Sequence, residues 1–120
     1  FAVLCLASIR DAAERRTVMA ELHATGHDVV DISLAQVARF AGNMLVVQPA
    51  TGRPQLVMSQ SAHDALTPAQ RGQLAQHCEL LPLRIPTIET LGGGSARCML
   101  AEVLLPERAG NQGVRAGLPG

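Results

Sequence analysis

The chain of 120 residues has the length of one ordinary domain, and its 48% hydrophobic content is enough to build a core. Its ten basic residues, all arginine, balance ten acidic residues, so the formal net charge is zero. The only aromatic residues are Phe1 and Phe40. Nucleic-acid binding needs clustered positive charge and, for single strands, stacking rings, so this composition argues against a nucleic-acid partner.

The cysteines and the hydropathy pattern indicate the cellular compartment of the protein. Cys5, Cys78 and Cys98 form no Cys-x-x-Cys pair, and one of the three would be left over in any disulfide scheme. This usage fits a reducing cytoplasm. No apolar run approaches the roughly 20 residues that span a bilayer, and no basic signal-peptide region stands at the N-terminus. We therefore predict a cytoplasmic protein without a membrane partner.

The first 47 residues predict alternating strands and short helices. Asp11 is a good N-cap with Glu14 as its capping-box partner, and Gly26 ends that helix. The predicted elements are a buried strand at 1–7, a helix after Asp11, a strand at 29–32, a brief helix from Ser33 through Phe40, and a strand at 44–47.

The second half begins with a hairpin, because turn residues at 49–54 separate two apolar segments. Thr67 and Pro68 start a helix that runs to about His77. The strand expected at 80–85 is interrupted by Pro82, which indicates an edge or a bulge. The predicted list closes with a loop before Cys98, a last strand at 99–105, and a glycine-rich flexible tail at 107–120.

A weak internal repeat supports an α/β fold of repeated units. Residues 1–32 and 55–85 both read as strand, helix, strand at similar spacing.

The most informative feature for function is Cys98, which follows a glycine run and Arg97. Glycines such as Gly93 and Gly94 let a ligand approach the backbone and let N–H groups point at a developing negative charge. A cationic neighbour favours the thiolate, which is the attacking form of cysteine. The pattern predicts a nucleophile, and a buried core cysteine at the start of a strand is the equally weighted alternative.

Other polar residues permit several interpretations. Asn43 is either a turn residue or a polar group that faces a substrate channel. Glu89 caps backbone near the glycine loop, orients Arg97 or contacts substrate. His23 and His27 have the i, i+4 spacing of metal ligands, but Gly26 intervenes and no third ligand is near, so we predict no metal site.

A phosphate-binding interpretation of the glycine run is also disfavoured. The run lacks the Gly-Lys-Ser/Thr ending of phosphate loops and is predicted to lead into a strand, not a helix.

The segment Gly92-Gly93-Gly94-Ser95-Ala96-Arg97-Cys98-Met99 resembles the nucleophile motif of the pentein superfamily of guanidine-modifying enzymes. Residues 40–45, 58–62 and 87–89 resemble blocks of its bacterial amidinotransferase-like branch, which includes citrulline-utilising hydrolases. The resemblance covers roughly residues 1–106.

The resemblance implies a fold. Penteins are five-bladed α/β propellers of ββαβ modules, so this chain would supply about two modules and the closing cysteine strand of a partial propeller. Residues 1–106 would be the C-terminal part of the catalytic domain. We expect N-terminal modules of the same protein to be missing from this fragment.

The resemblance also implies an activity that needs no cofactor. Cys98 would attack the guanidino or ureido carbon of a small molecule, citrulline or an arginine derivative, with Gly93, Gly94, Ser95, Arg97 and Asn43 as substrate-binding or loop-supporting residues. The family's acid/base histidine belongs to a His-Thr-Asn motif that this chain lacks. The chain alone is therefore expected to be inactive. The alternative is a non-catalytic pentein-like binding or assembly module with Cys98 in its core.

Overall fold

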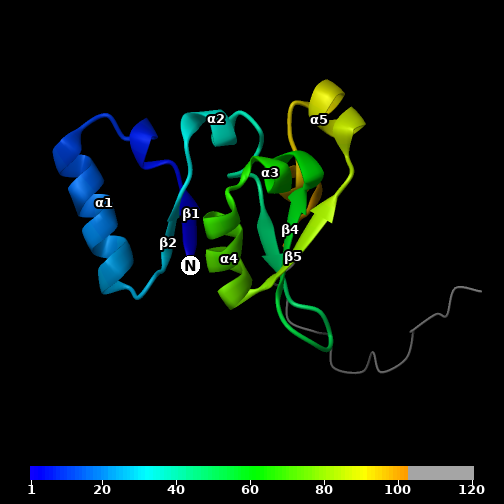
Figure 1. Ribbon diagram of the computed structural model, residues 1–120, viewed down its shortest axis with the longest axis horizontal. Helices are drawn as coiled ribbons and strands as arrows, with labels where there is room; N and C mark the ends of the chain where they lie inside the picture. The colour runs from blue at the N-terminus through cyan, green and yellow to red at the C-terminus, as the bar shows by residue number, and fades with distance from the viewer. Residues whose placement is uncertain (103–120) are drawn as a thin grey trace, which may run out of the picture.

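The computed structural model describes residues 1–102, and the predicted tail at 107–120 lies outside this range. The described residues form an α/β protein with two small sheets and several helices (Figure 1). The α/β class predicted from the sequence is confirmed.

The first unit is a parallel strand, helix, strand arrangement. It consists of β1 (Ala2–Leu4), the 3-10 turn η1 (Leu6–Ser8), α1 (Ala12–Ala24) and β2 (Val29–Asp31). Strand β1 pairs with β2 so that Val3 lies opposite Val30. The carboxylate of Asp11 caps α1 by accepting the backbone N–H groups of Ala13 and Glu14, which satisfies donors that the first helical turn leaves free.

The second unit has the order strand, strand, helices, strand. It consists of β3 (Leu45–Val47), β4 (Gln55–Ser59), α3 (Gln60–Ala65), α4 (Pro68–His77) and β5 (Glu79–Leu83). Strand β4 is central, antiparallel to β3 and parallel to β5. The predicted hairpin, the helix that begins at Pro68 and the edge position of the strand with Pro82 are all confirmed.

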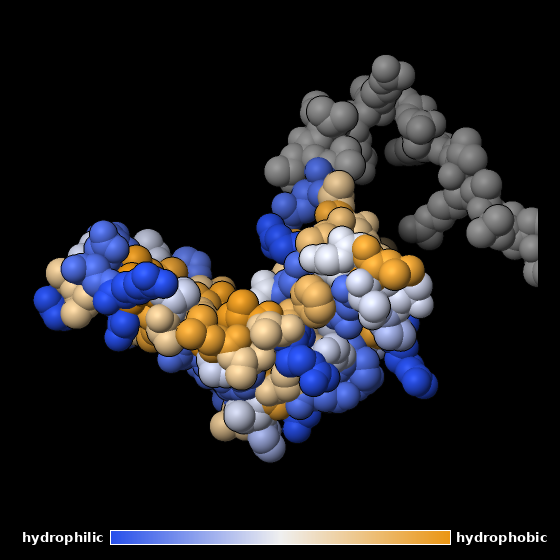
Figure 2. Space-filling model, turned by 90° about the horizontal axis from the view of Figure 1, so that it is seen from above, coloured by the Kyte–Doolittle hydropathy of each residue, from blue (hydrophilic) through white to orange (hydrophobic). Residues whose placement is uncertain are grey.

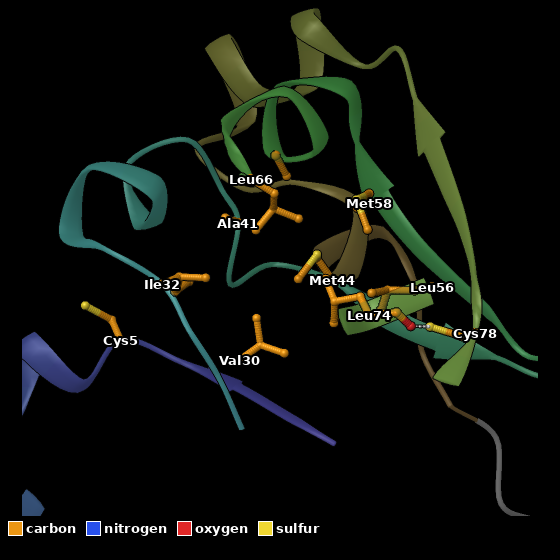
Figure 3. Close-up of a cluster of buried hydrophobic side chains, with 11 residues drawn as sticks. Cys5, Val30, Ile32, Ala41, Met44, Leu56, Met58, Leu66, Leu74 and Cys78 are labelled. Carbon is orange, nitrogen blue, oxygen red and sulfur yellow. Dashed lines mark hydrogen bonds between the residues drawn. The ribbon is translucent and has the colours of Figure 1, made fainter. Parts of the chain in front are cut away.

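Helix α4 joins the two units. It lies between β2 and the three-stranded sheet and contacts both β2 and β5 (Figure 1). Leu74 on α4 is fully buried, as are Val30 on β2 and Met58 on β4. These side chains belong to one cluster that draws on both sheets (Figure 3). A shared core of this kind holds the two units together through burial of apolar surface.

The short helix α2 (Leu34–Val37) is also fixed by polar contacts. Ser33 and Gln36 form a capping box at its start. The amide of Gln36 then donates to the carbonyl of Ala65 at 2.8 Å and to Gln70 Oε1 at 2.7 Å. Gln36 therefore ties the connection between the two units to α3 and α4.

Several predicted boundaries are wrong. The first strand covers Ala2–Leu4 because residues 6–8 turn, and the brief helix ends at Val37, before Phe40. Helix α3 was not predicted from the sequence. Helix α5 (Pro86–Gly92) occupies most of the expected loop before Cys98. Its signals were present, because proline favours the first helical turn and glycine the position after the last.

The predicted strand after Cys98 is also wrong within the described residues. Residues 96–99 form a second 3-10 turn, η2 (Ala96–Met99), and 100–102 are not in a strand, while 103–105 lie outside the described range. This turn packs beside β4, but β3 and β5 already occupy both edges of β4. The backbone instead closes short-range bonds, from the Cys98 N–H to the Ser95 carbonyl and from the Leu100 N–H to the Arg97 carbonyl.

Both sheets have open edges, and apolar side chains reach the surface. Within residues 1–102, each strand except β4 pairs on one side alone. Helix α2 exposes Leu34 and Val37 on the upper side of Figure 1. Figure 2 views that side and shows hydrophobic residues gathered left of its centre. None of the helices in the described part of the chain is long and apolar enough to cross a membrane.

Candidate active site at Cys98

Cys98 lies on η2, and its thiol is exposed, whereas Cys5 and Cys78 are buried. Ser95 and Ala96, directly before it, are completely buried and anchor the turn beside β4. The thiol thus projects from a fixed support into solvent. Within residues 1–102, Cys98 is not part of the buried core.

The side chain of Asn43 contacts the η2 turn at two points. Its Nδ2 donates to Cys98 Sγ at 3.0 Å, and its Oδ1 accepts the Arg97 backbone N–H at 2.9 Å. A backbone N–H can only donate, so the second bond fixes which end of the amide faces the sulfur. Asn43 therefore presents a donor to Sγ, and a donor stabilises the thiolate more than the thiol.

A tight turn before β3 places Asn43 there. Its backbone N–H donates to the carbonyl of Phe40 at 2.8 Å, and the intervening Ala41 is fully buried. Phe40 adopts a positive φ of 62°, which is unfavourable for a bulky residue. The turn role and the site-facing role proposed for Asn43 from the sequence are compatible, because its backbone closes the turn and its side chain holds the thiol.

The pKa of Cys98 is lowered from its ordinary value. The main cause is the hydrogen bond from Asn43, followed by a backbone hydrogen bond from Ser95, and the charge of Arg97 contributes less. The slight desolvation of the thiol acts in the opposite direction. A lowered pKa increases the fraction of thiolate at neutral pH and hence the nucleophilicity available there.

Ser95 supports the turn from beneath. Its hydroxyl donates to Glu89 Oε1 on α5 at 2.7 Å. Since Ser95 is fully buried, this bond satisfies a hydroxyl that would otherwise be costly to desolvate. Sequence reasoning left the role of Glu89 open among three options, and the structure shows it bonded to Ser95.

Gly93 and Gly94 have different roles: one ends a helix and the other allows a close approach of the cysteine. Gly93 ends α5 in the left-handed conformation with φ of 65°, which glycine adopts without steric cost. Gly94 lies so close to Cys98 that an added Cβ would be 3.0 Å from both Cβ and Sγ of the cysteine. Because Gly94 has no side chain, the thiol of Cys98 can occupy the adjacent space.

A cavity of about 420 Å³ adjoins the turn. Arg97, next to Cys98, and Gly42, next to Asn43, line it together with Glu102 and apolar residues of β1 and β3. The cavity therefore lies beside both partners of the Sγ contact and combines an apolar wall with one positive and one negative side chain.

The four histidines of the chain do not hydrogen-bond to Cys98. Two of them bond to acids, His77 Nε2 to Asp28 Oδ2 at 3.0 Å and His63 Nδ1 to Asp64 Oδ1 at 3.2 Å. His27 contacts the hydroxyl of Thr25. Among residues 1–102, no cluster of three or more His, Cys, Asp or Glu side chains suited to a metal ion occurs.

The residues predicted from the sequence thus lie close together around the η2 turn. Cys98, Arg97 and Asn43 are joined by direct hydrogen bonds, although Asn43 is 55 positions away from the cysteine. Ser95 and Gly94 shape the turn itself. Sequence reasoning missed the bond between Ser95 and Glu89, because it did not identify α5.

The chain thus presents an exposed thiol on a glycine-supported turn, beside a unit of strand, strand, helices, strand order. A family model described as N,N dimethylarginine dimethylhydrolase, eukaryotic, matches residues 1–105. The chain belongs to this family, a member of the pentein superfamily whose hydrolases act on guanidino groups. No curated protein and no solved structure matches the chain.

Proposed function

We propose that this chain carries the nucleophile of a cytoplasmic hydrolase of the amidinotransferase-like branch of the penteins. Residues 1–106 would form the C-terminal part of its catalytic domain. Its substrate would be a small molecule, either an arginine derivative or citrulline. The family match supports a guanidino substrate, and the motif around Cys98 supports the branch.

The observation that carries the proposal is the contact between Asn43 Nδ2 and the exposed Cys98 Sγ. It gives the sulfur a donor and leaves it accessible to a substrate. A buried thiol such as Cys78, whose pKa is raised by burial, has neither property. Geometry and pKa therefore both support Cys98 as the nucleophile.

The proposed reaction has two steps. Cys98 Sγ bonds to the guanidino or ureido carbon, and the bond from that carbon to the leaving nitrogen breaks as the nitrogen takes up a proton and departs as an amine or ammonia. A water oxygen then bonds to the same carbon, the S–C bond breaks, and the thiolate is restored. With a ureido substrate, Arg97 and the backbone N–H groups of Gly93 and Gly94 would stabilise the negative charge that develops on the oxygen of the adduct.

The proton donor would come from outside this chain. None of the four histidines hydrogen-bonds to Cys98, and the side chains that touch the sulfur are not acids. We propose that further ββαβ modules of the same protein supply the acid/base group and the carboxylates that hold the substrate. The unit β3 to β5 would be one complete module of the resulting propeller, and β1, α1 and β2 part of another.

Release of amine and ammonia tests the proposal. The 120-residue chain and a longer polypeptide that includes the proposed additional modules are each incubated with N,N-dimethylarginine, arginine and citrulline, with Cys98→Ala variants as controls. Release should require the longer polypeptide and Cys98, because loss of an acid/base group commonly costs about 10²- to 10⁴-fold.

Two outcomes would contradict different parts of the proposal. Release that depends on Cys98 in the short chain would place the acid/base group among its own residues. Equal release by the longer polypeptide and its Cys98→Ala variant would remove Cys98 from the mechanism.

A further inference from the structure

A second cavity, of about 250 Å³, lies where α3, the end of β5 and the start of α5 meet. It does not include Cys98 or Asn43 among its lining residues. Two arginines, Arg39 and Arg84, and two acids, Asp64 and Glu89, share its wall. We call it the arginine cavity.

The two guanidinium groups have unused hydrogen-bonding capacity. Within residues 1–102 neither forms an ion pair with a carboxylate. Arg39 donates one bond, from Nε to Ser61 Oγ at 3.0 Å. The side chain of Arg84 makes no hydrogen bond with another described residue. Arginine presents five donors in a planar fork that matches a carboxylate, so most of these donors remain available to a ligand.

In each of the two acids, one carboxylate oxygen accepts a hydrogen bond that orients the side chain. Asp64 Oδ1 accepts Gln60 Nε2 at 2.8 Å, and Glu89 Oε1 accepts the Ser95 hydroxyl. The second oxygen of each carboxylate accepts no hydrogen bond from another described residue. Each acid is thus oriented by its neighbour and retains an acceptor for a cationic group.

The balance of charge distinguishes between ligand classes. A simple anion would meet two carboxylates as well as two guanidinium groups, and a simple cation would meet the reverse. A zwitterion places a negative and a positive end in the same small volume and satisfies both pairs. Ile85 and Pro86 add an apolar surface to the wall, which suits an aliphatic side chain.

We propose that the arginine cavity binds a free α-amino acid with an aliphatic side chain. Its carboxylate would accept hydrogen bonds from Arg39 and Arg84, and its ammonium group would donate to Asp64 and Glu89. The volume corresponds to about eight waters at roughly 30 Å³ each, enough for an amino acid of this size. This site goes beyond the reaction proposed for Cys98.

Titration with L-norvaline, followed through backbone amide resonances of the full chain, tests the site. Norvaline has neither a guanidino nor a ureido group, so the result does not depend on the reaction proposed for Cys98. Amides around Arg39, Asp64 and 84–89 should shift together on one binding curve. The Arg84→Gln variant should bind about tenfold more weakly, because it loses charge-assisted hydrogen bonds.

Arg16→Gln is the matched control, since Arg16 is an exposed arginine on α1 and does not line the cavity. It should bind norvaline like the unaltered chain. Arg39→Gln provides a second test if Arg84→Gln disturbs the fold. Butylamine, which lacks the carboxylate, and pentanoate, which lacks the ammonium group, should each bind at least about tenfold more weakly than norvaline.

Three results would overturn the proposal. One is a set of shifts that lies away from the cavity. Another is unchanged affinity in both arginine variants. The third is equal binding of norvaline and either of its single-charge analogues, which would show that the cavity does not recognise a zwitterion.

Discussion

Cys78 and Cys98 are the same residue type in opposite surroundings. Cys78 ends α4 inside the shared core, is 1% exposed, and donates its S–H to the carbonyl of Leu74 at 3.4 Å (Figure 3). Burial raises the pKa of this thiol. Cys98 is exposed and accepts a hydrogen bond from Asn43, which lowers its pKa.

The difference shows that the tertiary partner, more than the neighbouring sequence, decides what a cysteine does. His77 and Arg97, the residues before the two thiols, both provide a basic side chain. The distinguishing contact for Cys98 comes from a distant turn, whereas Cys78 receives its environment from the core. A thiol that donates to a carbonyl is held as a thiol, and a thiol that receives a donor is favoured as a thiolate.

The largest expected effect is a difference in alkylation rate between these two cysteines. Cys78 is protected by the core and reacts after local or global opening, whereas Cys98 is open to reagent. Iodoacetamide at neutral pH should label Cys98 on the order of a hundredfold faster or more. Peptide mass spectrometry measures both labelling rates in one sample. Similar rates would contradict the difference in accessibility between Cys78 and Cys98.

The next effect concerns the core that surrounds Cys78. Leu74→Ala should lower the free energy of unfolding by about 2–5 kcal/mol, because Leu74 is fully buried and little can fill the cavity left behind. Leu91→Ala is the matched control, since Leu91 is 82% exposed and its loss should change stability by about 0.5 kcal/mol or less. Urea unfolding compares the two variants.

Labelling of Cys98 in the same variants sharpens the comparison. Where Leu74→Ala remains folded, the rate at Cys98 should stay near that of the unaltered chain while Cys78 becomes faster. A parallel rise in the labelling rate at both cysteines would show that the η2 turn depends on the core as a whole.

A smaller effect is expected from Gly94→Ala. The new methyl group would lie 3.0 Å from Cβ and Sγ of Cys98, so the thiol must move away. Because Cys98 is exposed, the stability cost should stay near 1 kcal/mol, while the bond from Asn43 is lost and labelling slows severalfold. Gly72→Ala is the control, since an added Cβ there meets no neighbour within 4 Å. Unchanged labelling in Gly94→Ala would show that the glycine is not needed for the geometry of the thiol.

Local signals in the sequence predicted most of the fold. Asp11 and Thr67 mark helix starts, and the turn residues at 49–54 mark the hairpin, because capping and turn chemistry act over a few residues. Within the described residues the strand expected after Cys98 does not form, because residues 96–99 close a 3-10 turn through short-range backbone bonds, from the Cys98 N–H to the Ser95 carbonyl and from the Leu100 N–H to the Arg97 carbonyl.

The site was predicted in part for a related reason. Glycines next to a cysteine are visible in the sequence, so Cys98 and Gly94 stood out. The donor from Asn43 depends on how the turn before β3 is placed, and the bond between Ser95 and Glu89 depends on how α5 is placed; no short pattern encodes either.

The pH dependence of Cys98 alkylation in the native chain and in urea tests the central claim most directly. Because Asn43 and the Ser95 backbone lower the pKa of Cys98, the native rate should reach half its maximum at a lower pH than in the unfolded chain. Asn43→Ala should move the native midpoint upward, and Gln48→Ala, at an exposed site, should not. Identical midpoints in native and unfolded chains, unmoved by Asn43→Ala, would contradict the assignment of Cys98 as an activated nucleophile.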